Sequence, residues 1–272
     1  SGFYLGAFLM SFAANISLLF TENHFMERFS KAAKYGFEGV EILSPYEWAA
    51  KDIRTALKEN SLKQVLINSP PGNVENGERG RAAIPGMEGD FWADIQKAIE
   101  YASILDCPQI HVMAGVLKSP EQLNAARSTF IENLKRAAPV AAKHGIRLLI
   151  EPINDKKDIP GYFLTKIPAA RDIISHVAED NVQLQFDFYH AQIMHGDLTT
   201  LVQDHLDITS HFQISNLPGR CEPSRGEINY PYLFSLLESL NYSGWIGCEY
   251  RPTKNTLDSL DWATPFGIGK QN

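Results

Sequence analysis

Short apolar runs alternate with longer amphipathic stretches from residue 10 to the end of the chain. The runs have the length of buried strands, and the stretches between them repeat apolar positions at helical spacing. Phe25, Phe29 and Ala32, for example, fall on one face of a helix that Gly36 would end. The pattern predicts a single (β/α)8 TIM barrel. Its eight strands are expected at residues 11–16, 39–43, 64–68, 109–113, 147–151, 183–187, 211–214 and 245–249.

Each of the last four expected strands carries a polar side chain able to bind a divalent cation. These residues are Glu151, Asp187, Gln213 and Glu249. Because the carboxyl ends of neighbouring strands adjoin at one face of a parallel barrel, we expect the four side chains to converge. Clustered carboxylates repel one another, and a bound cation offsets that repulsion. Three carboxylates and one amide make an oxygen-rich site, which favours Mg²⁺ or Mn²⁺.

A cation held between two glutamates suits proton transfer beside a carbonyl group. The cation would polarise the carbonyl and stabilise an enediolate, while each glutamate exchanges a proton with the substrate. Return of the proton to the neighbouring carbon is an aldose-ketose isomerisation. Return to the same carbon from the other face is an epimerisation, so both reactions stay open at this point.

The segment at residues 69–90 is unusually long and rich in glycine and proline for a barrel connection. Loops of this length inside a compact domain are usually functional or disordered. We expect it to lie over the mouth of the barrel as a substrate lid, with an ordered packing loop as the alternative.

Composition narrows the class of protein. The 272 residues are 44% hydrophobic, which suits one domain, expected at residues 10–272 after a cloning-derived or disordered leader at residues 1–9. A formal charge of -7 without a basic stripe argues against nucleic acid. No apolar run reaches the roughly 18 residues of a membrane span. Three cysteines without CxxC spacing fit a reducing cytoplasm. Nothing in the sequence sets the oligomeric state.

Six segments between Met10 and about Pro252 together resemble the hydroxypyruvate isomerase family of the xylose isomerase-like barrels. They are residues 12–17 (FAANIS), 77–80 (GERG), 150–154 (IEPIN), 187–190 (DFYH), 226–230 (GEINY) and 244–250 (GWIGCEY). The resemblance implies a metal-dependent isomerase that interconverts hydroxypyruvate, a small hydroxy-keto acid, and tartronate semialdehyde. It also implies that Glu151 and Glu249 are an acid/base pair as well as metal ligands, and that Asp187 and Gln213 complete the metal site.

The resemblance further implies that His190 and Arg220 bind the substrate. A planar guanidinium is well shaped to hold the carboxylate of a keto acid. The alternatives are a buried supporting role for His190 and a surface ion pair between Arg220 and Glu222. Three further candidates for substrate binding are Asn68, His111 and Glu78, of which the last lies in the long loop.

Other functions are compatible with parts of this pattern. Relatives of nearly the same pattern isomerise 2-oxo-tetronates, four-carbon acids with the same carbonyl, hydroxyl and carboxylate groups. A ketose 3-epimerase and a catalytically inactive sugar-acid binding barrel are further alternatives. A DNA repair endonuclease of the same fold would need more histidines around several zinc ions and a positive face for phosphates.

Overall fold

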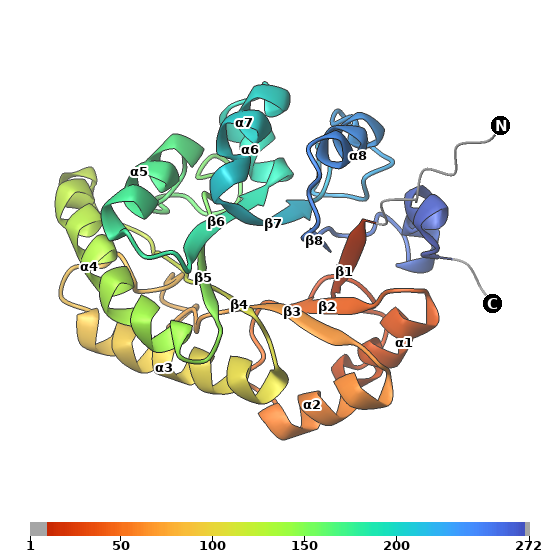
Figure 1. Ribbon diagram of the computed structural model, residues 1–272, viewed down its shortest axis with the longest axis horizontal. Helices are drawn as coiled ribbons and strands as arrows, with labels where there is room; N and C mark the ends of the chain where they lie inside the picture. Colours follow the sequence, from red (N-terminus) through yellow and green to blue (C-terminus); the bar gives the residue numbers. More distant parts are fainter. Residues whose placement is uncertain (1–9, 270–272) are drawn as a thin grey trace.

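The computed structural model describes residues 10–269, and its eight strands form one closed parallel barrel (Figure 1). Each strand neighbours the next along the chain, and β8 pairs with β1. The strands are β1 Ser11–Asn15, β2 Gly39–Ile42, β3 Lys63–Asn68, β4 Gln109–His111, β5 Arg147–Ile150, β6 Val182–Asp187, β7 Thr209–Ile214 and β8 Trp245–Cys248. The predicted (β/α)8 barrel is confirmed. The expected leader at residues 1–9 lies outside the described residues.

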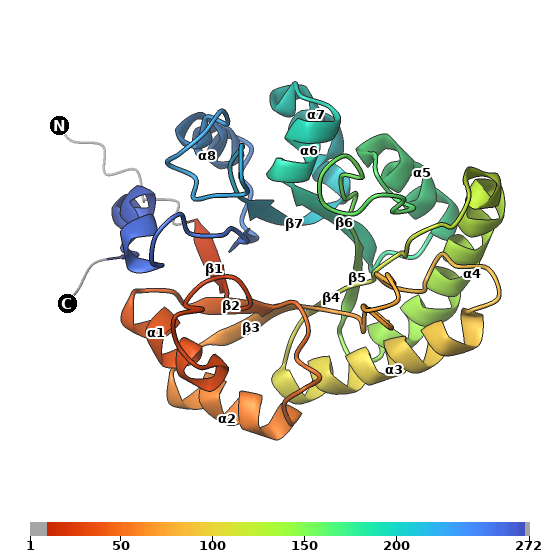
Figure 2. The same ribbon diagram turned by 180° about the vertical axis from the view of Figure 1, so that it is seen from behind.

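Helices surround the barrel, as Figure 2 shows from behind. They are α1 Arg28–Lys34, α2 Ala50–Glu59, α3 Glu88–Leu105, α4 Leu123–Ala142, α5 Ile167–Val177, α6 Phe188–Met194, α7 Leu198–His205 and α8 Tyr230–Ser239. Short 3-10 turns are η1 Phe25–Glu27, η2 Pro120–Gln122, η3 Leu206–Ile208, η4 Leu257–Ser259 and η5 Asp261–Phe266. None of the helices within residues 10–269 is long and apolar enough to cross a membrane.

The apolar core lies between the strands and the helices. Phe186 and Phe212, on neighbouring strands, are fully buried and pack against Phe188 at the start of α6. Tyr230, the first residue of α8, packs edge-on against Phe188. These contacts pack α6 and α8 against the barrel.

The inside of the barrel contains buried polar side chains as well as apolar ones. Gln213 on β7 donates a hydrogen bond to Glu41 on β2, with 3.0 Å between Nε2 and Oε2. Since β1 and β8 separate these two strands, the bond has to cross the barrel interior. The apolar runs from which the strands were predicted gave no sign of this hydrogen bond.

The long loop is ordered and docked on the end of β4. Ala82 and Ala83 are fully buried, and the backbone N–H of Ala83 donates to the carbonyl of Ala114 at 2.7 Å. Asn133 in α4 donates from Nδ2 to the carbonyl of Ala82 at 2.8 Å. At Gly80, a side chain would collide with the backbone of Met113. The loop ends one turn earlier than expected, at the start of α3, and its contacts favour the packing loop over the lid.

Candidate active site

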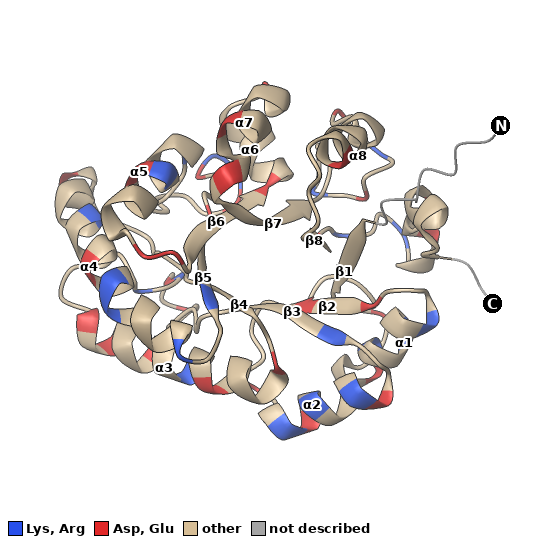
Figure 3. Cartoon of the chain, viewed as in Figure 1, with Lys and Arg blue, Asp and Glu red and all other residues tan. Residues whose placement is uncertain are grey.

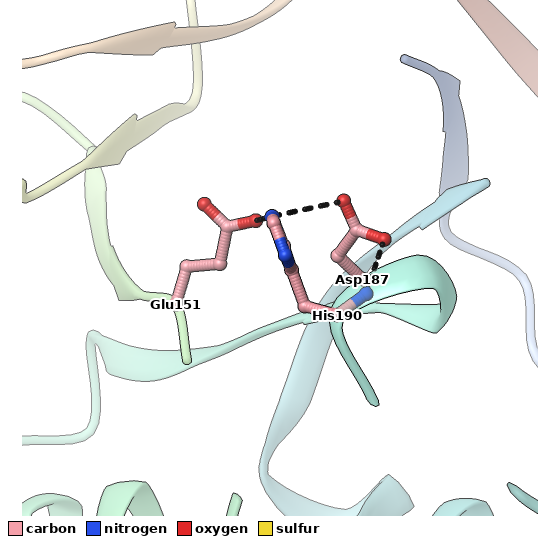
Figure 4. A group of neighbouring side chains, drawn as sticks. All are labelled: Glu151, Asp187 and His190. Carbon is pink, nitrogen blue, oxygen red and sulfur yellow. Dashed lines mark hydrogen bonds and ion pairs between the residues drawn. The ribbon is translucent and has the colours of Figure 1, made fainter. Parts of the chain in front are cut away.

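Three of the predicted metal ligands come together at the carboxyl ends of the strands. Glu151 is the first residue after β5, Asp187 is the last of β6, and Glu249 is the first after β8. Ligand atoms of Glu151, Asp187 and His190 lie within 4.8 Å of one another (Figure 4). Arg220 connects the third carboxylate to this group, since its Nη2 lies 2.8 Å from Glu249 Oε1 and 3.6 Å from Asp187 Oδ2. The three carboxylates therefore form one buried cluster.

Burial raises the pKa of all three carboxyl groups. It raises the pKa of Glu151 well above its ordinary value, and the nearby charge of Glu249 raises it further. Burial also raises the pKa of Glu249 to about 8 and that of Asp187 to about 6, although Arg220 opposes both shifts. The carboxyl groups of Glu249 and Asp187 can therefore hold or release a proton near neutral pH, as general acid/base catalysis requires.

Asp187 has one oxygen that fits a cation. Its Oδ1 accepts hydrogen bonds from the backbone N–H groups of Tyr189 at 2.7 Å and His190 at 3.4 Å, and so caps helix α6. Its Oδ2 is fully buried and accepts no hydrogen bond from the described residues. A buried carboxylate oxygen without a donor is costly, and a bound cation would satisfy it. Glu151, Asp187 and His190 form a buried group whose ligand atoms are close enough together to hold a metal ion.

The protonation of His190 is set by Asn154. The backbone N–H of Asn154 donates to His190 Nδ1 at 3.3 Å, and the side-chain Nδ2 lies 2.7 Å from the same atom. Burial, together with the charge of Arg220, lowers the pKa of His190 well below its ordinary value, so the ring is neutral. Since Nδ1 accepts hydrogen bonds, the proton lies on Nε2. Nε2 is 3.8 Å from both Glu151 Oε1 and Asp187 Oδ2, and a protonated Nε2 suits a substrate oxygen better than a cation.

Asp158 joins the two predicted substrate-binding residues, and the sequence analysis missed it. Its Oδ2 accepts hydrogen bonds from Asn154 Nδ2 at 2.6 Å and from the Tyr189 hydroxyl at 2.9 Å. Its Oδ1 lies 3.5 Å from Arg220 Nη1. Asp158 therefore orients Arg220 directly and His190 through Asn154. Only its distance of seven residues from Glu151 is visible in the sequence, and that spacing carries no signal.

Arg220 faces the cluster rather than the surface. Its guanidinium also lies over the ring of Tyr189, 5.2 Å from the ring centre. The alternative partner, Glu222, accepts hydrogen bonds from the backbone N–H and the hydroxyl of Thr253 instead. The backbone of Arg220 has a φ of 55°, a left-handed conformation that few residues adopt outside turns. Arg220 therefore does not pair with Glu222 in this structure, and its role in binding the substrate carboxylate stays a prediction.

The fourth predicted ligand, Gln213, is bonded inside the barrel. Its Oε1 accepts a hydrogen bond from Gln185 Nε2 at 2.6 Å, and its Nε2 donates to Glu41. It nevertheless lies at the level of the cluster, because it is the register partner of Asp187. Its role as a metal ligand stays a prediction.

Three candidates for substrate binding remain. His111 Nδ1 lies 3.3 Å from Glu151 Oε2, although neither ring nitrogen makes a hydrogen bond with the described residues. Burial lowers the pKa of His111 to about 3, so its ring is neutral. Asn68 is buried at the end of β3. Glu78 is bound within its own loop by Arg81 at 2.9 Å. Substrate contacts by these three residues stay predictions.

Comparisons with known proteins agree with the observed fold. Residues 29–266 match a family model described as xylose isomerase-like TIM barrel. The chain is 46% identical over 255 residues to a 2-oxo-tetronate isomerase of Cupriavidus necator, with 94% of this chain and 98% of the relative covered. It is 42% identical over 258 residues to the hydroxypyruvate isomerase of Escherichia coli, with 95% and 100% covered. A crystal structure described as an AP endonuclease, family 2, from Brucella melitensis has a TM-score of 0.92 at 47% identity, with 94% and 98% covered.

Proposed function

Because the chain belongs to the xylose isomerase-like TIM barrel family and is an isomerase, we propose that it interconverts hydroxypyruvate and tartronate semialdehyde. The observation that carries the proposal is the buried cluster of Glu151, Asp187 and Glu249 with Arg220 against it. Carboxylates hold a divalent cation, and the guanidinium holds the carboxylate of a keto acid. In this proposal Gln213 is the fourth ligand, and the cation is Mg²⁺ or Mn²⁺.

Glu151 and Glu249 perform the proton transfers. They come from β5 and β8, and burial has raised the pKa of both carboxyl groups. One glutamate removes a proton from the hydroxyl-bearing carbon of hydroxypyruvate, which gives an enediolate. A proton is then delivered to the former carbonyl carbon, while the hydroxyl proton moves to the other oxygen, which yields tartronate semialdehyde. When bound, the cation polarises the carbonyl and stabilises the negative charge of the enediolate.

Arg220 and His190 hold the substrate between these two bases. The guanidinium of Arg220 binds the substrate carboxylate, in an orientation that Asp158 helps to set. The protonated Nε2 of His190 donates a hydrogen bond to a substrate oxygen. Both side chains are largely buried, so the reacting atoms are kept away from bulk water.

A 2-oxo-tetronate isomerase is the second candidate. The 46% identity to such an enzyme supports it, and a four-carbon acid offers the same groups to the cation and to Arg220. An epimerase of neutral ketoses is less well supported, because such substrates have no carboxylate for Arg220.

Cleavage of nucleic acid is also less well supported. The formal charge is -7, and basic and acidic residues are interspersed on the outer helices (Figure 3). The three buried cysteines are free, which supports a location in the reducing cytoplasm.

Turnover of hydroxypyruvate and of a 2-oxo-tetronate, measured side by side, tests the proposal. We expect hydroxypyruvate to be preferred with Mg²⁺ present, and activity to be lost after chelation and restored by Mg²⁺ or Mn²⁺. Preference for the four-carbon acid would keep the mechanism and change the substrate. Full activity in excess chelator would reject the metal-dependent mechanism.

A further inference from the structure

Glu41 is a buried carboxylate that takes no part in the chemistry described above. It lies on β2 inside the barrel and is 1% exposed. Three donors from two other strands surround it: Asn15 Nδ2 at 3.2 Å, Gln213 Nε2 at 3.0 Å, and His211 Nε2. A buried carboxylate is tolerated only where such donors satisfy its oxygens. Three polar side chains therefore hold the carboxylate of Glu41 inside the barrel.

The neighbouring strand leaves room for this carboxylate. Gly247 on β8 is the register partner of Gln213, and a side chain at Gly247 would collide with the carboxylate of Glu41. The backbone of Gly247 does not have a positive φ, so the glycine is needed for space rather than for its conformational freedom. Gly247 therefore leaves the space that the carboxylate of Glu41 occupies.

Glu41 decides which end of the Gln213 amide faces β2 and which end faces β6. A carboxylate only accepts hydrogen bonds, so Gln213 has to present its Nε2 to Glu41. The amide oxygen then lies on the other side, where it accepts a hydrogen bond from Gln185 on β6, the strand that ends in Asp187. An amide carbonyl has two lone pairs, and Gln185 uses one of them. If the amide turned over, two acceptor oxygens would face each other.

We propose that Glu41 is a positioning residue of the cation site. It fixes the Gln213 amide so that Oε1, and not the amide nitrogen, is available to the cation bound by Glu151, Asp187 and Glu249. The inference rests on the proposed function, because it assigns Gln213 as the fourth ligand. Partners that orient metal ligands typically change metal affinity by about 10- to 100-fold when they are removed.

Calorimetric titration of the chelated protein with Mg²⁺ or Mn²⁺, without substrate, tests this role. We expect Glu41→Gln to weaken binding by about 10- to 100-fold. Glu41→Asp keeps the charge but withdraws it by one methylene group, and we expect a comparable loss. Glu38→Gln, at an exposed position immediately before the same strand, is the matched control and should bind as the wild type does. Circular dichroism shows which variants are folded, and Glu41→Asp serves if Glu41→Gln is not.

A double-mutant cycle separates positioning from simple attraction between charges. Gln213→Ala alone should weaken binding, and in that background Glu41→Gln should have no further effect. Equal effects in both backgrounds, or wild-type affinity in Glu41→Asp, would show that Glu41 acts through its charge and would overturn the proposal. Wild-type affinity in Gln213→Ala would overturn it and would remove Gln213 from the proposed ligands, while leaving the proposed reaction at Glu151 and Glu249 intact. A wild-type protein that binds neither cation would reject the metal-dependent function itself.

Discussion

Replacement of Arg220 by methionine should remove the selectivity for substrates with a carboxylate. Arg220 Nη2 lies 2.8 Å from Glu249 Oε1, and Nη1 lies 3.5 Å from Asp158 Oδ1, so the guanidinium is held at the cluster. Methionine keeps an unbranched apolar stem and loses the charge and the donors. The variant therefore tests the guanidinium rather than the packing of the side chain.

The size of the effect follows from the bonds that the guanidinium would make. A hydrogen bond to a charged group contributes about 1.5–3 kcal/mol. Since about 1.4 kcal/mol corresponds to a factor of ten, kcat/KM for hydroxypyruvate should fall by roughly 10- to 150-fold. Dihydroxyacetone has the same hydroxyl and carbonyl groups but a neutral group in place of the carboxylate. Its inhibition constant should change much less.

Steady-state kinetics of hydroxypyruvate turnover, with dihydroxyacetone as competing inhibitor, measures both quantities. Arg225→Met is the matched control, because Arg225 is a largely exposed residue nearby in the chain, at 4.0 Å from Glu222. It should behave as the wild type does. A comparable weakening of both ligands in Arg220→Met would refute the reasoning, because it would mean that Arg220 supports the cluster without recognising the carboxylate.

Three further predictions concern stability and substrate orientation. In chelator, the contribution of Glu249 to the free energy of unfolding should be greatest below pH 4.5 and should be lost as the pH rises to about 8, because the pKa of about 8 in the folded protein lies above the ordinary 4.5. Urea unfolding at a series of pH values measures it, and a rise in stability over this range would contradict the shift. Mg²⁺ at about 100 times its dissociation constant should stabilise the protein by about 2.7 kcal/mol in the same assay, and an unchanged midpoint would argue against cation binding. Asp158→Asn should raise KM by about tenfold with a smaller change in kcat, since it weakens the charged contact with Arg220; an unchanged KM would remove Asp158 from substrate orientation.

The sequence was sufficient for the barrel and for the carboxylate cluster. Eight apolar runs that alternate with helical stretches have few other architectures, and residues at the ends of neighbouring parallel strands are brought together by the fold itself. That is why Glu151, Asp187 and Glu249 converge although nearly a hundred residues separate the first from the last.

The contacts that orient the site could not be predicted in the same way. The hydrogen bond between Glu41 and Gln213 joins positions 172 residues apart across the barrel interior. It depends on barrel closure and on the space at Gly247, and neither leaves a periodic signal. Asp158 is likewise recognisable only once the loop after β5 has brought it to Tyr189 and Arg220.

Isomerisation in D₂O by Glu151→Gln and Glu249→Gln, followed by NMR beside the wild type, tests the central claim most directly. The wild type with Mg²⁺ should form tartronate semialdehyde from hydroxypyruvate and incorporate solvent deuterium at carbon. Each variant should fold and should lose turnover by at least about 100-fold, since a neutral amide neither takes nor gives the proton. Turnover near the wild-type rate in either variant would contradict the assignment of a two-glutamate acid/base pair.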